Sequence, residues 1–269
     1  MPVRKPPALT SPRPSKAASP KTDARRAKAP PVKAPDSEGG PLPPQPVDQA
    51  TLAEIFRRFR EASPEPKGEL EHVDPYTLLV AVVLSAQSTD AGVNKATREL
   101  FKAADTPGKM VALGEDRVRE HIKTINFLNT KARNIVALSR RLVDEHGGVV
   151  PPARAVLETL PGVGRKSASV VLNMAFGEPT IAVDTHIFRV ANRIPLVLTK
   201  TADETQLALE AIVPDAFKLH AHHWLILHGR YVCKARRPEC YRCLIRDLCR
   251  YEPKTPAPDD AATVRRPRA

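Results

Sequence analysis

All four cysteines of the chain lie within one stretch of 17 residues near its C-terminal end. They follow the spacing C-x6-C-x2-C-x5-C and are Cys233, Cys240, Cys243 and Cys249. Four thiolates on one looped segment suit the four irons of a 4Fe-4S cluster. Structural zinc sites usually contain two closely spaced pairs of ligands, whereas this stretch contains only one. Zinc and unliganded thiols are the alternatives to an iron–sulfur cluster. Disulfides are not expected, because no apolar segment of a secretory signal follows the basic N-terminus.

The six residues between Cys233 and Cys240 form a basic loop that contains Lys234, Arg236 and Arg237. Wrapped around a bound cluster, this loop would present three cations in a fixed arrangement that suits phosphate groups. The alternative is a solvated surface loop. The three side chains are therefore candidate contacts for a polyanion.

A glycine-containing turn, Leu-Pro-Gly-Val-Gly-Arg-Lys over residues 160–166, lies between two stretches with helical periodicity. Its proline and glycines permit a tight hairpin, and Gly164 leads into a helix N-terminus whose unpaired N–H groups attract an anion. A helix-hairpin-helix of this kind holds a DNA phosphate without reading the base sequence. Gly162, Gly164 and Arg165 are the candidate DNA contacts, although an ordinary turn between two helices would look similar.

Lys166 lies in the first turn of the helix that follows this hairpin. The helix dipole disfavours a cation there and so favours loss of the lysine proton. A neutral amine can attack an electrophilic sugar carbon and form a Schiff base. The alternative role for a lysine beside an arginine is a phosphate contact.

Asp184 follows the apolar run Ile181 to Val183 and precedes a helix expected over residues 185–193. It is placed to cap that helix, and a capping carboxylate stays ionised. An ionised carboxylate could stabilise a cationic sugar in a transition state or assist proton transfers. Capping alone is the alternative. The histidines of the next helix are expected to be structural; they are His222, His223 and His228.

The elements that must position these side chains are predicted to be helices, since apolar residues recur at helical spacing and period-two alternation is scarce. We therefore expect an all-α protein. Asp90 is expected to cap one helix, and Asn129 or Thr130 a long helix that ends at Gly147 and Gly148. The other predicted helices cover residues 51–61, 76–87, 165–176, 185–193, 204–213 and 216–229.

Composition separates this core from its two ends. The chain has 269 residues and a formal net charge of +12, which makes a polyanion the first partner to consider. Residues 1–47 hold 13 of the 28 prolines, nine basic and three acidic residues and no aromatic residue, so we expect a disordered tail. Residues 251–269 are expected to form a second, short tail. No apolar run is long enough to span a membrane.

These residues together resemble the endonuclease III family of DNA base-excision glycosylases. The resemblance covers about residues 50–250 and depends on five motifs in the same order as in the family. They are LSAQSTD at 84–90, LPGVGRK at 160–166, VDTHIFRV at 183–190, HHWLILHGR at 222–230, and the cysteine loop.

The resemblance implies a two-domain helix-hairpin-helix glycosylase fold with DNA bound in the cleft between the domains. A six-helix barrel would cover residues 68–178, and a discontinuous cluster domain would combine residues 48–67 with 179–250. The resemblance also selects a structural 4Fe-4S cluster, held by the four cysteines, over zinc.

The resemblance implies a bifunctional glycosylase and abasic-site lyase that removes oxidised pyrimidines from duplex DNA. Lys166 would attack C1′ of the damaged nucleotide, expel the base and form an imine, and β-elimination would then cut the strand. Asp184 matches the essential carboxylate, and Gln87 matches a side chain that fills the gap left by the flipped base. Phe127 falls at an apolar wedge position in Ile-Asn-Phe-Leu-Asn, residues 125–129, where the family often has Gly-Leu-Tyr-Asn. An aromatic ring could stack in that gap, so the lesion preference is open.

Two other functions fit part of this pattern. A monofunctional adenine glycosylase shares the hairpin, the aspartate and the cluster, but it lacks a lysine at the position of Lys166 and has an extra C-terminal domain. A non-enzymatic DNA-binding module would not need both Lys166 and Asp184. We expect double-stranded DNA with damaged bases or abasic sites as the partner, no membrane contact, and a monomer. The expected location is the bacterial cytoplasm at the nucleoid, with organellar targeting by the N-terminal tail as the alternative.

Overall fold

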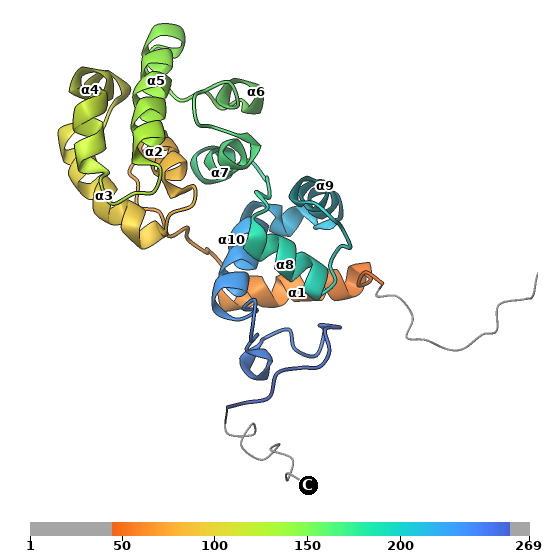
Figure 1. The fold of residues 1–269 in the computed structure, drawn as a ribbon. Helices are drawn as coiled ribbons and strands as arrows, with labels where there is room; N and C mark the ends of the chain where they lie inside the picture. Colours follow the sequence, from red (N-terminus) through yellow and green to blue (C-terminus); the bar gives the residue numbers. More distant parts are fainter. Residues whose placement is uncertain (1–44, 259–269) are drawn as a thin grey trace, which may run out of the picture. The chain divides into compact units, whose positions relative to one another are not determined.

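The computed structural model describes residues 45–258, and within this range every regular element is helical (Figure 1). The prediction of an all-α protein is confirmed for these residues. The elements are α1 Gln49–Ala62, α2 Pro75–Ser85, α3 Asp90–Ala103, α4 Pro107–His121, α5 Leu128–His146, α6 Arg154–Leu157, α7 Arg165–Phe176, α8 Thr185–Arg193, α9 Ala202–Ile212, α10 Asp215–Tyr231 and the 3-10 helix Cys240–Arg242. None of the described helices is long and apolar enough to cross a membrane.

Helix α2 shows how the sequence sets a helix boundary and a core together. The carboxylate of Asp74 accepts a hydrogen bond from the Thr77 N–H (2.7 Å), and the Thr77 hydroxyl accepts one from the Asp74 N–H (3.1 Å). Pro75 occupies the first turn, where its missing N–H leaves no hydrogen bond unmade. Every residue from Tyr76 to Leu84 is buried, as the unbroken apolar run predicts. The helix ends at Ser85, earlier than expected, so the next residues form a turn.

Two predicted helix caps are wrong. Thr89 caps α3, since its hydroxyl accepts a hydrogen bond from the Gly92 N–H (3.2 Å), and Asp90 is the first helical residue. Threonine and aspartate both cap well, so adjacent candidates are hard to distinguish by sequence. Helix α5 begins at Leu128, before Asn129 and Thr130, and its N-cap Phe127 makes no side-chain cap.

Two helices were absent from the prediction. Helix α4 is interrupted at Gly114, which has the non-helical angles φ 78° and ψ 163°. The apolar residues on the two sides of this kink therefore do not follow a single helical period. Helix α6 has four residues, too few to show a helical period. By contrast, α7 and α8 begin and end where the sequence predicts.

The buried apolar residues form two clusters within the described range. The first cluster takes residues from α2 to α7, between Tyr76 and Leu172. The second takes residues from α1, α8, α9, α10 and the cysteine segment, so α1 packs far from its sequence neighbours. Phe56 of α1 stacks on Phe217 with ring centroids 6.0 Å apart, and the Trp224 indole N–H donates to Ser63 O (2.8 Å). The domain bounds 48–67, 68–178 and 179–250 remain a prediction.

Parts of both predicted tails are ordered. Val47 is buried, and its N–H donates to Pro195 O (3.0 Å), so the packed chain begins before residue 48. Arg250 Nη1 donates to Gln45 O (3.2 Å) and Pro46 O (3.1 Å), so the end of the cysteine segment contacts the start of the described chain. Lys254 Nζ donates to Cys249 O (2.8 Å). The predictions for residues 1–44 and 259–269 lie outside the described residues.

Candidate functional site

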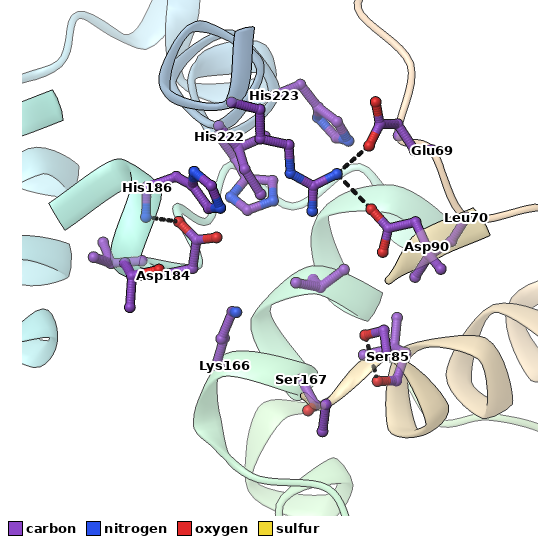
Figure 2. Close-up of a pocket in the computed structure, with 18 of the residues that line it drawn as sticks. Glu69, Leu70, Ser85, Asp90, Lys166, Ser167, Asp184, His186, His222 and His223 are labelled. Atoms are coloured by element: carbon purple, nitrogen blue, oxygen red, sulfur yellow. Dashed lines mark hydrogen bonds and ion pairs between the residues drawn. The ribbon is translucent and has the colours of Figure 1, made fainter. Parts of the chain in front are cut away.

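A cavity of about 790 Å³ is lined by residues from both hydrophobic clusters. Its wall includes the segment 67–70, the end of α2 with the turn after it, and the first turns of α7 and α8 (Figure 2). One face of α10 completes it. The volume lies within the range of small-ligand sites, about 300–1,000 Å³. Three predicted site residues line this cavity together: Gln87, Lys166 and Asp184.

The hairpin that precedes α7 has a backbone that requires glycine at one position. Gly162 has φ 80°, in the left-handed region, and a Cβ added there would lie 2.8 Å from Asn134 Nδ2. The Val163 N–H closes the turn on Leu160 O at 3.1 Å. Gly164 is the N-cap of α7 and makes no side-chain cap, so the first amides of this helix have no such acceptor. The hairpin therefore exposes an uncapped helix N-terminus beside Lys166 and Arg165.

Lys166 is the second residue of α7 and its side chain projects into the cavity (Figure 2). It is exposed, and no residue in the described range 45–258 forms a hydrogen bond or ion pair with its amine. An amine held at a helix N-terminus without a partner is chemically available. This arrangement fits a nucleophile and equally permits a phosphate contact.

Asp184 caps α8, as predicted, and uses one carboxylate oxygen to do so. Oδ1 accepts hydrogen bonds from the N–H groups of His186 and Ile187, both at 2.8 Å. Oδ2 has no hydrogen-bond donor within the described residues, and the side chain lines the cavity. Figure 2 shows Asp184 and Lys166 projecting into the same space from α8 and α7. The carboxylate is thus fixed by the helix and still presents an oxygen to the cavity.

The cavity floor contains two buried histidines of α10. Burial lowers the pKa of His222 to about 3 and that of His223 to about 4, so both imidazoles are neutral near pH 7. Nδ1 of each is buried and has no hydrogen-bond partner within the described chain. Their burial agrees with the structural role expected from the sequence.

Sequence reasoning missed a charged cluster on another side of the cavity. Arg230 of α10 pairs with Glu69 and with Asp90 (Figure 2). The Tyr231 hydroxyl also donates to Glu69. These residues come from three separate segments of the chain. Two of them lie inside the motifs 84–90 and 222–230, but no spacing rule predicts that the motifs meet.

The two residues predicted to fill the gap in the DNA have an unusual backbone: within the described chain they are the non-glycine residues with positive φ. Gln87 has φ 55° and Phe127 has φ 58°. Gln87 lines the cavity and is exposed, and Phe127, which does not line it, is 63% exposed. Left-handed backbone at such residues is uncommon and is typical of functional sites.

The four predicted cysteines line a second cavity, together with Arg193 and His228. All four are free thiols, and Cys233 and Cys240 are buried. Burial raises the pKa of the Cys243 thiol to about 11, so its thiolate form needs a bound cation. Four thiols around one space fit a group that is bound from four sides. Among the described residues, no group of three or more His, Cys, Asp or Glu could hold a single metal ion.

The basic loop lies beside this second cavity and contributes no residue to the cavity of Lys166. Lys234 Nζ pairs with Glu239 at 2.6 Å, and Arg236 and Arg237 are exposed. Arg193 Nη1 donates to Lys234 O at 2.7 Å, which holds the loop.

Residues 80–215 match the model of the HhH-GPD superfamily base excision DNA repair proteins. The chain is 53% identical over 208 residues to the endonuclease III of Escherichia coli strain K12, an alignment that covers 77% of this chain and 99% of the relative. It is 54% identical over 208 residues to the endonuclease III of Haemophilus influenzae, with the same coverage. The chain belongs to the endonuclease III family.

Solved structures of endonuclease III agree with this assignment. A trapped covalent intermediate of an endonuclease III with DNA matches with a TM-score of 0.71 and 40% identity, covering 76% of this chain and 96% of that chain. A non-covalent complex of an endonuclease III with DNA matches equally well. The endonuclease III family is a family of DNA glycosylases and abasic-site lyases, so this chain is a DNA repair enzyme with the helix-hairpin-helix fold.

Proposed function

We propose that this endonuclease III family member removes oxidised pyrimidines from duplex DNA and then cleaves the abasic strand as a lyase. The observation that carries this proposal is that two available groups line one cavity. They are the amine of Lys166, which has no partner among the described residues, and Oδ2 of Asp184, the carboxylate oxygen that does not cap α8. A monofunctional glycosylase needs only the carboxylate. The exposed amine therefore supports a covalent route.

In the proposed reaction the neutral Nζ of Lys166 attacks C1′ of the extruded nucleotide while the N-glycosidic bond breaks. The base leaves with the bonding electrons, and a proton neutralises it. Oδ2 of Asp184 stabilises positive charge that develops on the sugar, because a fixed carboxylate in a partly enclosed site interacts strongly with such charge. The added amine loses a proton, and the C1′–O4′ bond then breaks as the nitrogen lone pair forms the imine and O4′ takes up a proton. Removal of a C2′ proton then expels the 3′ phosphate by β-elimination.

The DNA backbone would be held at two places. The hairpin supplies the N–H groups around Gly162 and Gly164 and the charge of Arg165, and the cysteine loop supplies Arg236 and Arg237 with Lys234. Gln87 and Phe127 would fill the space left in the duplex, since extrusion of a base leaves a gap in the stack. The partner is then duplex DNA with a damaged base or an abasic site, bound by a monomer at the bacterial nucleoid.

We also propose that Cys233, Cys240, Cys243 and Cys249 hold a 4Fe-4S cluster. Four thiols around one cavity support this assignment. The cluster would be structural and would cross-link the C-terminal segment rather than take part in base release. A colourless protein that contains zinc after purification without air would contradict it.

The covalent route is tested by borohydride trapping on duplex DNA that contains an abasic site. We expect wild type and Lys102→Ala to form a stable adduct and Lys166→Ala to form none. Lys102 is an exposed lysine of α3 that does not line the cavity. An adduct with Lys166→Ala, or none with wild type, would overturn the lyase assignment. Base release from a panel of oxidised pyrimidines then defines the substrate.

A further inference from the structure

The turn that carries Gln87 is held by side chains from the first turn of α5 and from the segment just before it. Gln87 lies between the end of α2 and Thr89, with a left-handed backbone (φ 55°). An exposed turn with such a backbone needs outside contacts to keep one conformation, because left-handed backbone is unfavourable for a residue with a side chain. The contacts come from Asn126 and Lys131.

Lys131 is a buried lysine, only 6% exposed, without a carboxylate partner within the described residues. Its Nζ donates to Leu84 O (2.8 Å) and Ala86 O (2.6 Å) and contacts Ser88 Oγ at 3.1 Å. All three ammonium hydrogens therefore have an acceptor at the end of α2 or on the turn that follows it. The last turn of α2 contains no basic residue, so Lys131 supplies the cation that the negative end of this helix favours.

Asn126 completes the connection between the two segments. Its side-chain Nδ2 donates to Gln87 O at 2.7 Å. Three consecutive turn residues, Ala86 to Ser88, are thus each contacted by Asn126 or Lys131. Asn126 also immediately precedes Phe127, whose backbone is left-handed like that of Gln87.

We propose that Asn126 and Lys131 form a clamp that presents Gln87 and Phe127 to the duplex as one preorganised unit. In this role they are positioning residues, and neither needs to touch DNA. The inference depends on the proposed function, since it concerns how the duplex is opened at the damaged nucleotide. Preorganisation strengthens binding because the turn does not have to be ordered when DNA arrives.

The clamp is tested with a duplex in which 2-aminopurine stands opposite a tetrahydrofuran abasic analogue. Insertion of side chains into the gap unstacks the 2-aminopurine and raises its fluorescence. We expect wild type to give this rise. Asn126→Ala and Asn126→Asp remove the donor to Gln87 O, so we expect loss of the rise and about fivefold weaker binding to this duplex. Affinity for undamaged duplex, which depends on phosphate contacts, should stay the same.

Lys131→Met removes all three contacts and should weaken binding to the tetrahydrofuran duplex by about tenfold or more. Arg140→Met is the matched control, because Arg140 is an exposed cation of the same helix that makes no hydrogen bond to the described turn. Since Lys131→Met could unfold the protein, the Asn126 variants decide the question; Asn126 is exposed. Thermal unfolding verifies that they are folded.

The clamp is wrong if both Asn126 variants keep the wild-type fluorescence and affinity, or if wild type gives no fluorescence rise. It is also wrong if binding to undamaged duplex falls as much as binding to the tetrahydrofuran duplex. Neither measurement requires base release. A wild type that opens the tetrahydrofuran duplex but traps no adduct would therefore overturn the proposed chemistry and leave the clamp in place.

Discussion

The carboxylate of Asp184 has two oxygens in different environments. Oδ1 binds two amides at the start of α8, and Oδ2 faces the cavity without a donor among the described residues. The first oxygen contributes to stability and the second is available for chemistry. A substitution that separates the two roles is therefore informative.

In Asp184→Asn the amide oxygen still accepts from the helix, but the negative charge is lost. We expect single-turnover base release to fall by about 100-fold or more. The free energy of unfolding should change by less than about 0.5 kcal/mol, because the cap is retained. The measurements are base release from oxidised DNA and denaturant unfolding.

Thr106→Ala is the matched control, since Thr106 caps α4, which contributes no residue to the cavity. It should lower stability by about 1 kcal/mol and leave base release unchanged. Full activity of Asp184→Asn would show that the aspartate acts only as a cap.

Burial of His222 and His223 predicts a pH dependence of stability. Their pKa values of about 3 and about 4 in the folded protein lie below the ordinary value of 6.5, so the unfolded chain binds protons first as the pH falls. The free energy of unfolding is therefore not reduced by these histidines above pH 6.5. It declines from pH 6.5 toward pH 4, by up to about 1.4 kcal/mol per pH unit for each histidine. Denaturant unfolding from pH 7.5 to 5 should show a shallower decline in the double variant His222→Gln, His223→Gln. If the free energy of unfolding declined equally steeply with pH in wild type and in the double variant, the two histidines would not cause the pH dependence.

At the scale of elements, the hairpin before α7 combines a left-handed glycine with a close neighbour. Gly162 has both features, whereas Gly148 has φ 78° and no atom within 4 Å of an added Cβ. The two positions therefore share the backbone strain and differ in the contact with Asn134. This difference gives a comparison within one chain.

We expect Gly148→Ala to destabilise the protein by about 1 kcal/mol and to leave DNA affinity unchanged. Gly162→Ala should destabilise it more, and should also weaken binding to duplex DNA, because the hairpin has to move away from Asn134. Denaturant unfolding and fluorescence anisotropy with labelled duplex measure the two effects. Equal DNA affinity for both variants would separate the hairpin from phosphate binding.

Local sequence predicted some elements well and others poorly, for physical reasons. Helices α7 and α8 follow the N-caps Gly164 and Asp184, residues that favour helix boundaries, and both ranges agree with the prediction. Helix α5 begins at Leu128 after the N-cap Phe127, which makes no side-chain cap, and the preceding Asn126 bonds to another segment. Tertiary contacts of this kind leave no local pattern.

At the scale of the whole molecule, the site residues come from segments that are distant in sequence. The motifs predicted Lys166, Asp184 and the cysteines, because each depends on a local pattern. The Arg230 contacts with Glu69 and Asp90 depend on the packing of α10 against two other segments, so no local pattern could predict them. The family resemblance connected the motifs to one function before the fold was known.

The charge of the N-terminal segment predicts a salt-dependent contribution to DNA binding. Residues 1–44 contain nine basic and three acidic residues, half of the net charge of +12. Removal of these residues, with the buried Val47 kept, should weaken duplex binding at low salt and reduce the salt dependence of affinity. Replacement of the nine basic residues by glutamine is the matched control and should have the same effect. An unchanged affinity at low salt would show that the segment has no part in binding.

The contacts of Arg250 with Gln45 and Pro46 bring the end of the cysteine segment to the start of the described chain. We therefore expect the same arrangement of helices to form when the chain is opened at another point. A circular permutant that joins residue 258 to residue 45 by a flexible linker, and opens at the Gly147–Gly148 turn, should keep the cavity and its activity. Its new ends would lie at the end of α5, where a fused label could report on DNA without disturbing Lys166 or the cysteines.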